Sequence, residues 1–186
     1  MSVKHQLDRI VTAYMDLQHP LGWPLLPWEE QWQSPCLLEQ NSEGEPTPWC
    51  PIAINQPIDL FERLASALEC EIHPDIITYY TAYWSDPIYA DHANGELSLL
   101  FAWNEDELER LRANLIGHAL TKQRMRQPLT LFFACTEPDA DEFISLMNND
   151  GSVWLELPGK KPLRKLAESM TEFLTQLTPL PHPSTR

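Results

Sequence analysis

The spacing of apolar side chains along the chain predicts four amphipathic helices. In four stretches, apolar residues return every three or four positions, the interval that places them on one face of a helix. These stretches run from Leu7 to Leu17, Ile58 to Leu68, Leu108 to Leu120 and Leu163 to Leu177. The first should end at His19-Pro20, because proline cannot continue a helix.

The third of these helices has a marked gradient of charge. Asn104 is a suitable N-cap, and Glu107 stands at the third helical position, as in a capping box. Acidic side chains fill the first turn, whereas Lys122, Arg124 and Arg126 lie near the end. Both sets complement the helix macrodipole, so this polarity has a sufficient cause without any ligand.

Shorter apolar runs predict antiparallel strands. Residues 88–91 and 96–103 flank Asn94-Gly95, a dipeptide that suits a tight hairpin turn. Residues 129–135 are a candidate central strand, and 143–147 with 152–157 form a second hairpin.

Two segments are less regular. Residues 74–84 fit a helix or a strand, and we favour a short helix because Pro74 suits a first helical turn. The proline- and tryptophan-rich segment that follows the first helix should wrap around the domain, with a short strand at 35–39 and a turn at 41–45. Helices interspersed with antiparallel hairpins predict an α+β fold in which a mostly antiparallel sheet is flanked by several helices.

The length of 186 residues suits one domain, so we expect a single domain over residues 1–186 with a flexible tail at 179–186. Its longest apolar run, residues 97–103, is far shorter than the roughly 20 residues that span a bilayer. The first twenty residues lack the continuous apolar core of a secretory signal, which makes the cytoplasm the expected location. Four scattered cysteines are then expected to be reduced and mostly buried.

The net charge is −14, and the negative charge is unevenly distributed. Between Glu29 and Glu109 there are seventeen Asp or Glu residues and one base, Arg63. Such a field disfavours nucleic acid and anionic lipid, because both bind proteins through Lys and Arg. It favours a positively charged partner, although acidic surfaces also simply keep proteins soluble.

No pattern in the sequence predicts a cofactor or catalytic site. The phosphate-binding patterns GxGxxG and GxxxxGK[ST] do not occur, and the segment 137–142 (EPDADE) lacks the glycine and distal glutamate of a calcium loop. His118 is expected to pack against the core. His73 and His92 have acidic neighbours and could act as bases in a hydrolase, but no nucleophile motif accompanies them.

The segment 78–91 (TYYTAYWSDPIYAD) combines aromatic and acidic side chains. Rigid aromatic side chains anchor a partner and carboxylates select a basic one, so this composition is typical of a recognition surface. From this segment and its hairpin we select four candidate contact residues: Tyr80, Trp84, Asp91 and Glu96.

Residues 114–134 (NLIGHALTKQRMRQPLTLFFA) resemble the Syd family, bacterial proteins that interact with the SecY subunit of the protein translocase. The resemblance extends to SPC at 34–36, FER at 61–63, HPDIITYY at 73–80, LSLLFAWNEDEL at 97–108 and LAESMTEFLTQLTPL at 166–180. It therefore covers most of the chain.

The resemblance implies a monomer of the SUKH-like superfamily with a concave, electronegative groove that docks on the basic cytosolic loops of SecY. It also implies an indirect, peripheral location on the cytoplasmic side of the inner membrane and a role in checking translocon assembly. By position it adds Glu62, Asp86, Glu105 and Asp106 to the candidate contacts. Other SUKH-like proteins are immunity proteins, so neutralisation of a basic toxin is the alternative function.

Overall fold

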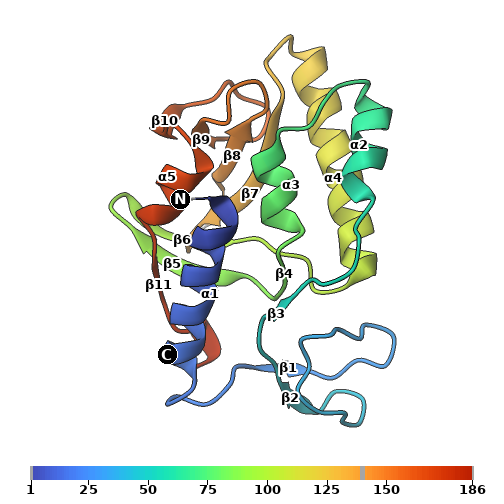
Figure 1. Ribbon diagram of the computed structural model, residues 1–186, viewed down its shortest axis with the longest axis vertical. Helices are drawn as coiled ribbons and strands as arrows, with labels where there is room; N and C mark the ends of the chain where they lie inside the picture. Colours follow the sequence, from blue (N-terminus) through green and yellow to red (C-terminus); the bar gives the residue numbers. More distant parts are fainter. Residues whose placement is uncertain (1, 139–140, 186) are drawn as a thin grey trace.

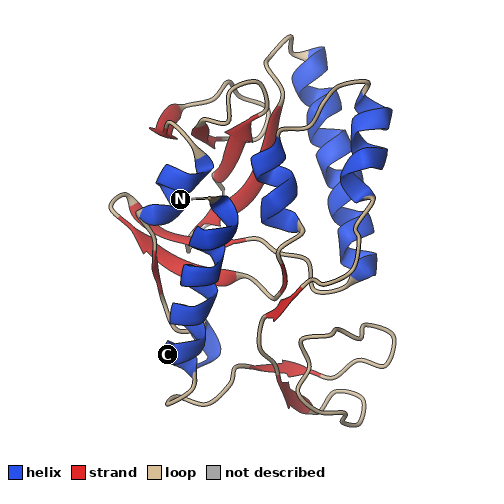
Figure 2. Cartoon of the chain, in the orientation of Figure 1, coloured by secondary structure: helices blue, strands red, loops and turns tan. Residues whose placement is uncertain are grey.

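The computed structural model describes residues 2–138 and 141–185. Within these residues the main element is an antiparallel sheet of seven strands in the order β10-β9-β8-β7-β6-β5-β11, flanked by helices (Figure 2). The predicted α+β class with a mostly antiparallel sheet is confirmed. The strands are β5 (Ile88–His92), β6 (Gly95–Leu99), β7 (Thr130–Thr136), β8 (Phe143–Met147), β9 (Val153–Glu156), β10 (Arg164–Ala167) and β11 (Thr178–Pro179).

Strand β7 occupies the centre of this sheet, as its apolar run predicted. Leu131, Phe133 and Ala134 are completely buried. The predicted β5–β6 hairpin is confirmed, but its turn is Ala93-Asn94, since Gly95 already pairs with His92, and β6 ends at Leu99 without reaching residue 103. Ala102 instead bridges to Trp84 outside the sheet, so the chain leaves the ladder before α4 begins.

Three helices, α1 (Val3–Gln18), α3 (Pro74–Tyr80) and α5 (Met170–Thr175), lie in front of the sheet in the view of Figure 1. The first begins where the Ser2 hydroxyl accepts a hydrogen bond from the His5 backbone N–H (3.3 Å), and it packs against both of the others. Leu7, Ile10, Val11 and Tyr14 of its predicted apolar stripe are buried, whereas Leu17 is 38% exposed. The preference for a helix after His73 is also confirmed.

Helices α2 (Leu60–Leu68) and α4 (Glu105–Arg124) pack side by side along one flank of the molecule, and α4 contacts β7 (Figure 1). Leu108 and Leu115 of the predicted α4 stripe are buried. Leu120 is 41% exposed, which corrects its expected burial. Lys122 is buried in its place because it forms an ion pair with Glu156 of β9, a partner that the helical pattern does not reveal.

The proline-rich segment forms a separate ladder of β1 (Leu25–Pro27) and β2 (Pro46–Pro48) at one end of the molecule (Figure 1). The strand predicted at 35–39 is wrong: only an isolated bridge joins Leu37 to Trp49, because the chain turns where the Ser34 hydroxyl accepts from the Cys36 backbone N–H (3.0 Å). The segment is anchored by Trp49, which is completely buried and lies edge-on to Trp103 at 5.6 Å between ring centroids. Two further short strands, β3 (Ile52–Ala53) and β4 (Tyr83–Trp84), pair beside it.

The C-terminal region differs from the single helix predicted between Leu163 and Leu177. Its first half is the edge strand β10, paired with β9, and the helix α5 starts only after Ser169, whose hydroxyl accepts from the Glu172 N–H (3.1 Å). Pairing with the sheet edge outweighs the local helical spacing. Beyond α5, the region expected to be a tail contains β11 and the short helix η1 (Pro183–Thr185), with the His182 side chain buried between them.

None of the described helices has both the length and the apolar character that a membrane crossing requires.

Candidate functional site

The start of α4 is tied to the proline-rich segment by a set of hydrogen bonds. The Asn104 side-chain carbonyl caps the helix by accepting from the Glu107 N–H (2.9 Å), and its amide donates to the Gln33 carbonyl (3.0 Å). The Glu107 carboxylate accepts a hydrogen bond from the backbone N–H of Trp103 (2.6 Å). The predicted capping box would have used the backbone N–H of the N-cap residue Asn104, one position later. The Trp103 indole donates to the Trp32 carbonyl (3.3 Å). These bonds fix the segment against the helix terminus.

Three neighbouring hollows surround this helix start. The first, here called the tryptophan hollow, has a volume of about 200 Å³ and is lined by Leu26, Pro27, Glu29, Trp32, Leu37, Asp86, Trp103 and Glu107. The second, of about 370 Å³, is lined by Glu30, Gln31, Gln33, Pro35, Gln56, Trp84, Asn104, Glu105 and Asp106. The third, of about 290 Å³, lies between α2 and α4 and shares Glu105 and Asp106 with the second.

Carboxylates make up most of the charged groups that line these hollows. We define the acidic face as the eight that take part: Glu29, Glu30, Asp59, Asp86, Glu105, Asp106, Glu107 and Glu109. Within the described part of the chain, Arg63 is the only base in the lining, and it pairs with Glu109 and with Asp59 (3.1 Å). The face therefore keeps a large excess of negative charge.

The carboxylates of the acidic face differ in their environments. Burial raises the pKa of Glu107, the nearby charge of Asp86 adds to this rise, and the bond from the Trp103 N–H opposes it. Hydrogen bonds from Arg63 and Arg112 lower the pKa of the exposed Glu109. Glu109 is therefore paired with two arginines, whereas Glu107 interacts with the charge of Arg110 without a direct ion pair in the described chain.

The structure brings four of the eight predicted contact residues together at the start of α4. Glu105 and Asp106 are exposed in the first helical turn, Asp86 is partly exposed after β4, and Trp84 lines the second hollow although only 2% of its surface is exposed. These four come from two separate elements, β4 with the loop after it and α4.

The other four predicted residues lie elsewhere. Glu62 is exposed on α2 without lining the hollows, and Asp91 and Glu96 are paired opposite each other on the β5–β6 hairpin. Tyr80 is corrected to a core residue: it is 1% exposed, and its hydroxyl donates to the Phe132 carbonyl (2.9 Å). Aromatic composition alone does not separate core rings from surface rings.

Sequence reasoning missed several members of the acidic face. Glu29 and Glu30 reach it because the proline-rich segment folds back on α4, and Asp59 and Glu109 reach it because α2 packs against α4. The available signal was the density of tryptophan in that segment, which indicated attachment to the domain without indicating where.

The described hydrogen bonds of His73 and His92 are with a backbone N–H and with amide groups. His73 Nδ1 accepts from the Asp75 backbone N–H (3.2 Å), and His92 Nε2 lies 2.9 Å from the Gln176 side-chain oxygen, so neither described bond orients an imidazole by a carboxylate. His118 packs against aromatic rings and bonds to Thr130 Oγ1 (2.9 Å), as its predicted packing requires. No described cluster of His, Cys, Asp or Glu has the composition of a metal site, and the segment 137–142 is only partly within the described residues.

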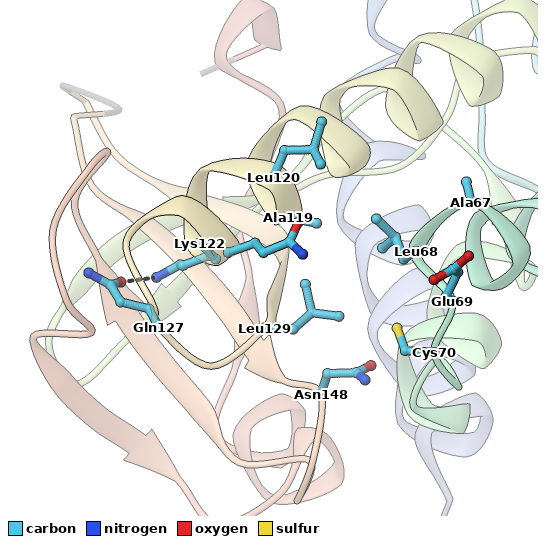
Figure 3. A pocket seen from close by; sticks show the side chains of 11 residues that line it. Ala67, Leu68, Glu69, Cys70, Ala119, Leu120, Lys122, Gln127, Leu129 and Asn148 are labelled. Atoms are coloured by element: carbon cyan, nitrogen blue, oxygen red, sulfur yellow. Dashed lines mark hydrogen bonds between the residues drawn. The ribbon is translucent and has the colours of Figure 1, made fainter.

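Another hollow, of about 400 Å³, lies at the opposite end of α2 and α4. Figure 3 shows Leu68 of α2 facing Ala119 and Leu120 of α4 across it, with Leu129 behind them. Lys122 donates to the Gln127 side-chain oxygen (3.2 Å) at one side. The lining combines apolar and amide side chains with one acid, Glu69, and one base, Lys122, so it lacks the excess of carboxylates found at the start of α4.

The fold and the acidic face together define a class: a small α+β protein whose distinctive site is a hollowed, carboxylate-lined surface. The chain belongs to the Syd family, since the family model described as Syd protein (SUKH-2) matches residues 4–179. It is 44% identical over 164 residues to Protein Syd of Colwellia psychrerythraea, covering 83% of this chain and 80% of that protein. It is 38% identical over 181 residues to Protein Syd of Alteromonas mediterranea, covering 97% and 98%. The resemblance seen in the sequence is confirmed.

Proposed function

We propose that this protein binds the basic cytosolic loops of SecY through its acidic face. The observation that carries the proposal is the set of eight carboxylates around the start of α4, where Arg63 is the only base in the described lining. Membrane proteins carry an excess of Lys and Arg in their cytoplasmic loops. Such loops supply the charge that the acidic face lacks.

Membership of the Syd family supports this choice of partner, because the resemblance to that family implies an interaction with SecY. In the proposal, the protein acts by binding and not by catalysis, as a monomer. It reaches the cytoplasmic side of the inner membrane through SecY, because an acidic surface has no attraction for anionic lipid. Binding to SecY that is free of its usual partners would then serve as a check on translocon assembly.

A second candidate is an immunity protein that neutralises a basic toxin. It is favoured by the SUKH-2 description of the matching family and by the same acidic face, which fits any strongly basic protein surface. The two candidates differ in what the protein recovers from a lysate of its own cells. Translocase supports the first, and a basic toxin in its place supports the second.

The direct test is binding of the purified protein to proteoliposomes that contain SecY, with SecY-free liposomes of the same lipid as control. We expect binding only where SecY is present. Raising salt from about 0.05 to about 0.5 M should weaken it at least about tenfold, because exposed charge pairs are screened beyond the Debye length. Binding that does not change with salt would contradict electrostatic docking.

A further inference from the structure

We propose that the tryptophan hollow is a socket for one lysine or arginine side chain of a basic partner segment. The inference rests on the proposed function, because it specifies how the acidic face holds a cationic chain. The hollow would give one cationic side chain of the partner a defined binding position, in addition to the general attraction of the acidic face. Asp86 and Glu107 would bind the cation, and Trp32 and Trp103 would contact its stem.

The walls of the hollow match the two parts of such a side chain. Leu26, Pro27 and Leu37 provide an apolar wall, and the rings of Trp32 and Trp103 provide aromatic surface. Lysine and arginine bury their methylene stems against apolar and aromatic groups while their charged ends stay paired or hydrated. The carboxylates of Glu29, Asp86 and Glu107 lie in the same lining to receive the charge.

One aromatic wall already contacts a cation within the chain. The guanidinium of Arg110 lies over the Trp32 ring, 4.2 Å from its centroid. Arg110 itself does not line the hollow. The Trp32 ring therefore already makes a cation–π contact in this fold. The hollow that this ring also lines has room for a cation from a partner.

The carboxylates of Asp86 and Glu107 are held by contacts with neighbouring groups of the chain. One oxygen of Glu107 is held by the Trp103 N–H (2.6 Å), and Asp86 Oδ2 lies 3.4 Å from His182 Nε2. Within the described chain, neither forms an ion pair with a lysine or arginine. Burial is the main cause of the raised pKa of Glu107, and the charge of Asp86 adds to the rise while that of Arg110 opposes it. A further cation in the hollow would favour the ionised form of both carboxylates.

The size of the hollow limits the occupant. Its volume of about 200 Å³ lies below the roughly 300–1,000 Å³ of typical small-molecule sites and admits a single side chain or a few waters. Glu29 in the lining is exposed to solvent, so the hollow can be reached by a side chain from an extended peptide. Charge complementarity selects a basic residue over an apolar one of the same length.

The test uses the whole protein labelled with ¹⁵N, in which the indole N–H signals of Trp103 and Trp32 report on the hollow. The probes are acetyl-Gly-Arg-Gly-amide, its lysine counterpart, and a neutral control with norleucine. We expect saturable shifts of the Trp103 indole signal with the two cationic peptides only. Asp86→Asn should weaken binding about five- to tenfold, because a charge-assisted contact is lost.

Two further variants keep the test decisive. Asp91→Asn removes a carboxylate of the β5–β6 hairpin, outside the hollow, and should leave the titration unchanged. Glu29→Gln alters an exposed lining residue, so it probes the hollow even where Asp86→Asn disturbs the bond to His182. Equal shifts with the norleucine peptide, no shift with any peptide, or unchanged titrations in both lining variants would overturn the socket.

The peptide result and the SecY result can fail separately. Loss of SecY-dependent binding with an intact peptide titration would overturn the proposed partner and leave the socket standing. SecY binding by a protein that shows no cation-specific titration would overturn the socket alone.

Discussion

Nε2 of His182 lies 3.4 Å from Oδ2 of Asp86, so the last folded turn of the chain contacts the acidic face. Nδ1 of the same ring accepts from the Ser184 backbone N–H (3.2 Å), which leaves the proton of the neutral imidazole on Nε2, where it points to Asp86. The ring also lies edge-on to Trp49 and Tyr89. One buried histidine thus joins the C-terminus, the core and the candidate site.

His182→Ala is predicted to lower the free energy of unfolding by about 2–3 kcal/mol. The substitution leaves a cavity beside Trp49 and removes a bond to Asp86. Urea denaturation measures the change, and His5→Ala on the exposed side of α1 is the matched control, expected within about 0.5 kcal/mol of wild type. A loss as small as that of the control would show that residues beyond β11 do not contribute to the fold.

The ion pair between Lys122 and Glu156 gives a second prediction. Their side chains are 5% and 0% exposed, so Lys122→Met leaves a buried carboxylate without its cation. We expect a loss of about 3–5 kcal/mol in the free energy of unfolding, and recovery of most of it in the double variant Lys122→Met/Glu156→Leu. Chemical denaturation of the single and double variants measures both effects.

The exposed pair of Lys165 and Glu168 provides the comparison. Lys165→Met should cost about 1 kcal/mol or less, because solvent screens that pair. If Lys122→Met cost no more than Lys165→Met, the pair would not be buried as described.

His118 gives a prediction for pH. Burial lowers the pKa of its imidazole below the ordinary value of 6.5, so the unfolded chain binds a proton more readily than the folded one. Stability should therefore fall as pH drops below about 6.5, down to the folded-state pKa. Urea midpoints at several pH values should show a smaller decrease in His118→Gln than in wild type. Identical decreases would contradict this assignment.

The sequence predicted the elements whose signal is local. The N-cap residue Asn104 and the acidic residues of the first turn predicted where α4 begins. The apolar run 129–135 predicted the central position of β7 in the sheet. The β10 strand was mistaken for helix because Leu163 and Leu166 have helical spacing, while the pairing of Arg164–Ala167 with β9 is decided by the sheet edge. Local spacing carries no information about that edge.

The candidate site was predictable in its charge and only partly in its members. Glu105 and Asp106 were selected by position from the resemblance to the Syd family, and both lie in the first turn of α4. Glu29 joins them through hydrogen bonds that tie the proline-rich segment to Trp103 and Asn104, contacts between residues about seventy positions apart. Tyr80 was misplaced because the composition of 78–91 does not distinguish an anchor from a core ring.

We propose that SecY binds the acidic face at the start of α4. The most direct measurement compares the double variant Glu105→Lys/Asp106→Lys with Asp91→Lys/Glu96→Lys, an equal charge change on the β5–β6 hairpin. Binding to SecY proteoliposomes is measured at low salt, with unfolding midpoints to confirm that both proteins fold. We expect at least about tenfold weaker binding for the α4 variant and a much smaller change for the hairpin variant. Equal losses in the two folded variants, or no loss in the first, would contradict it.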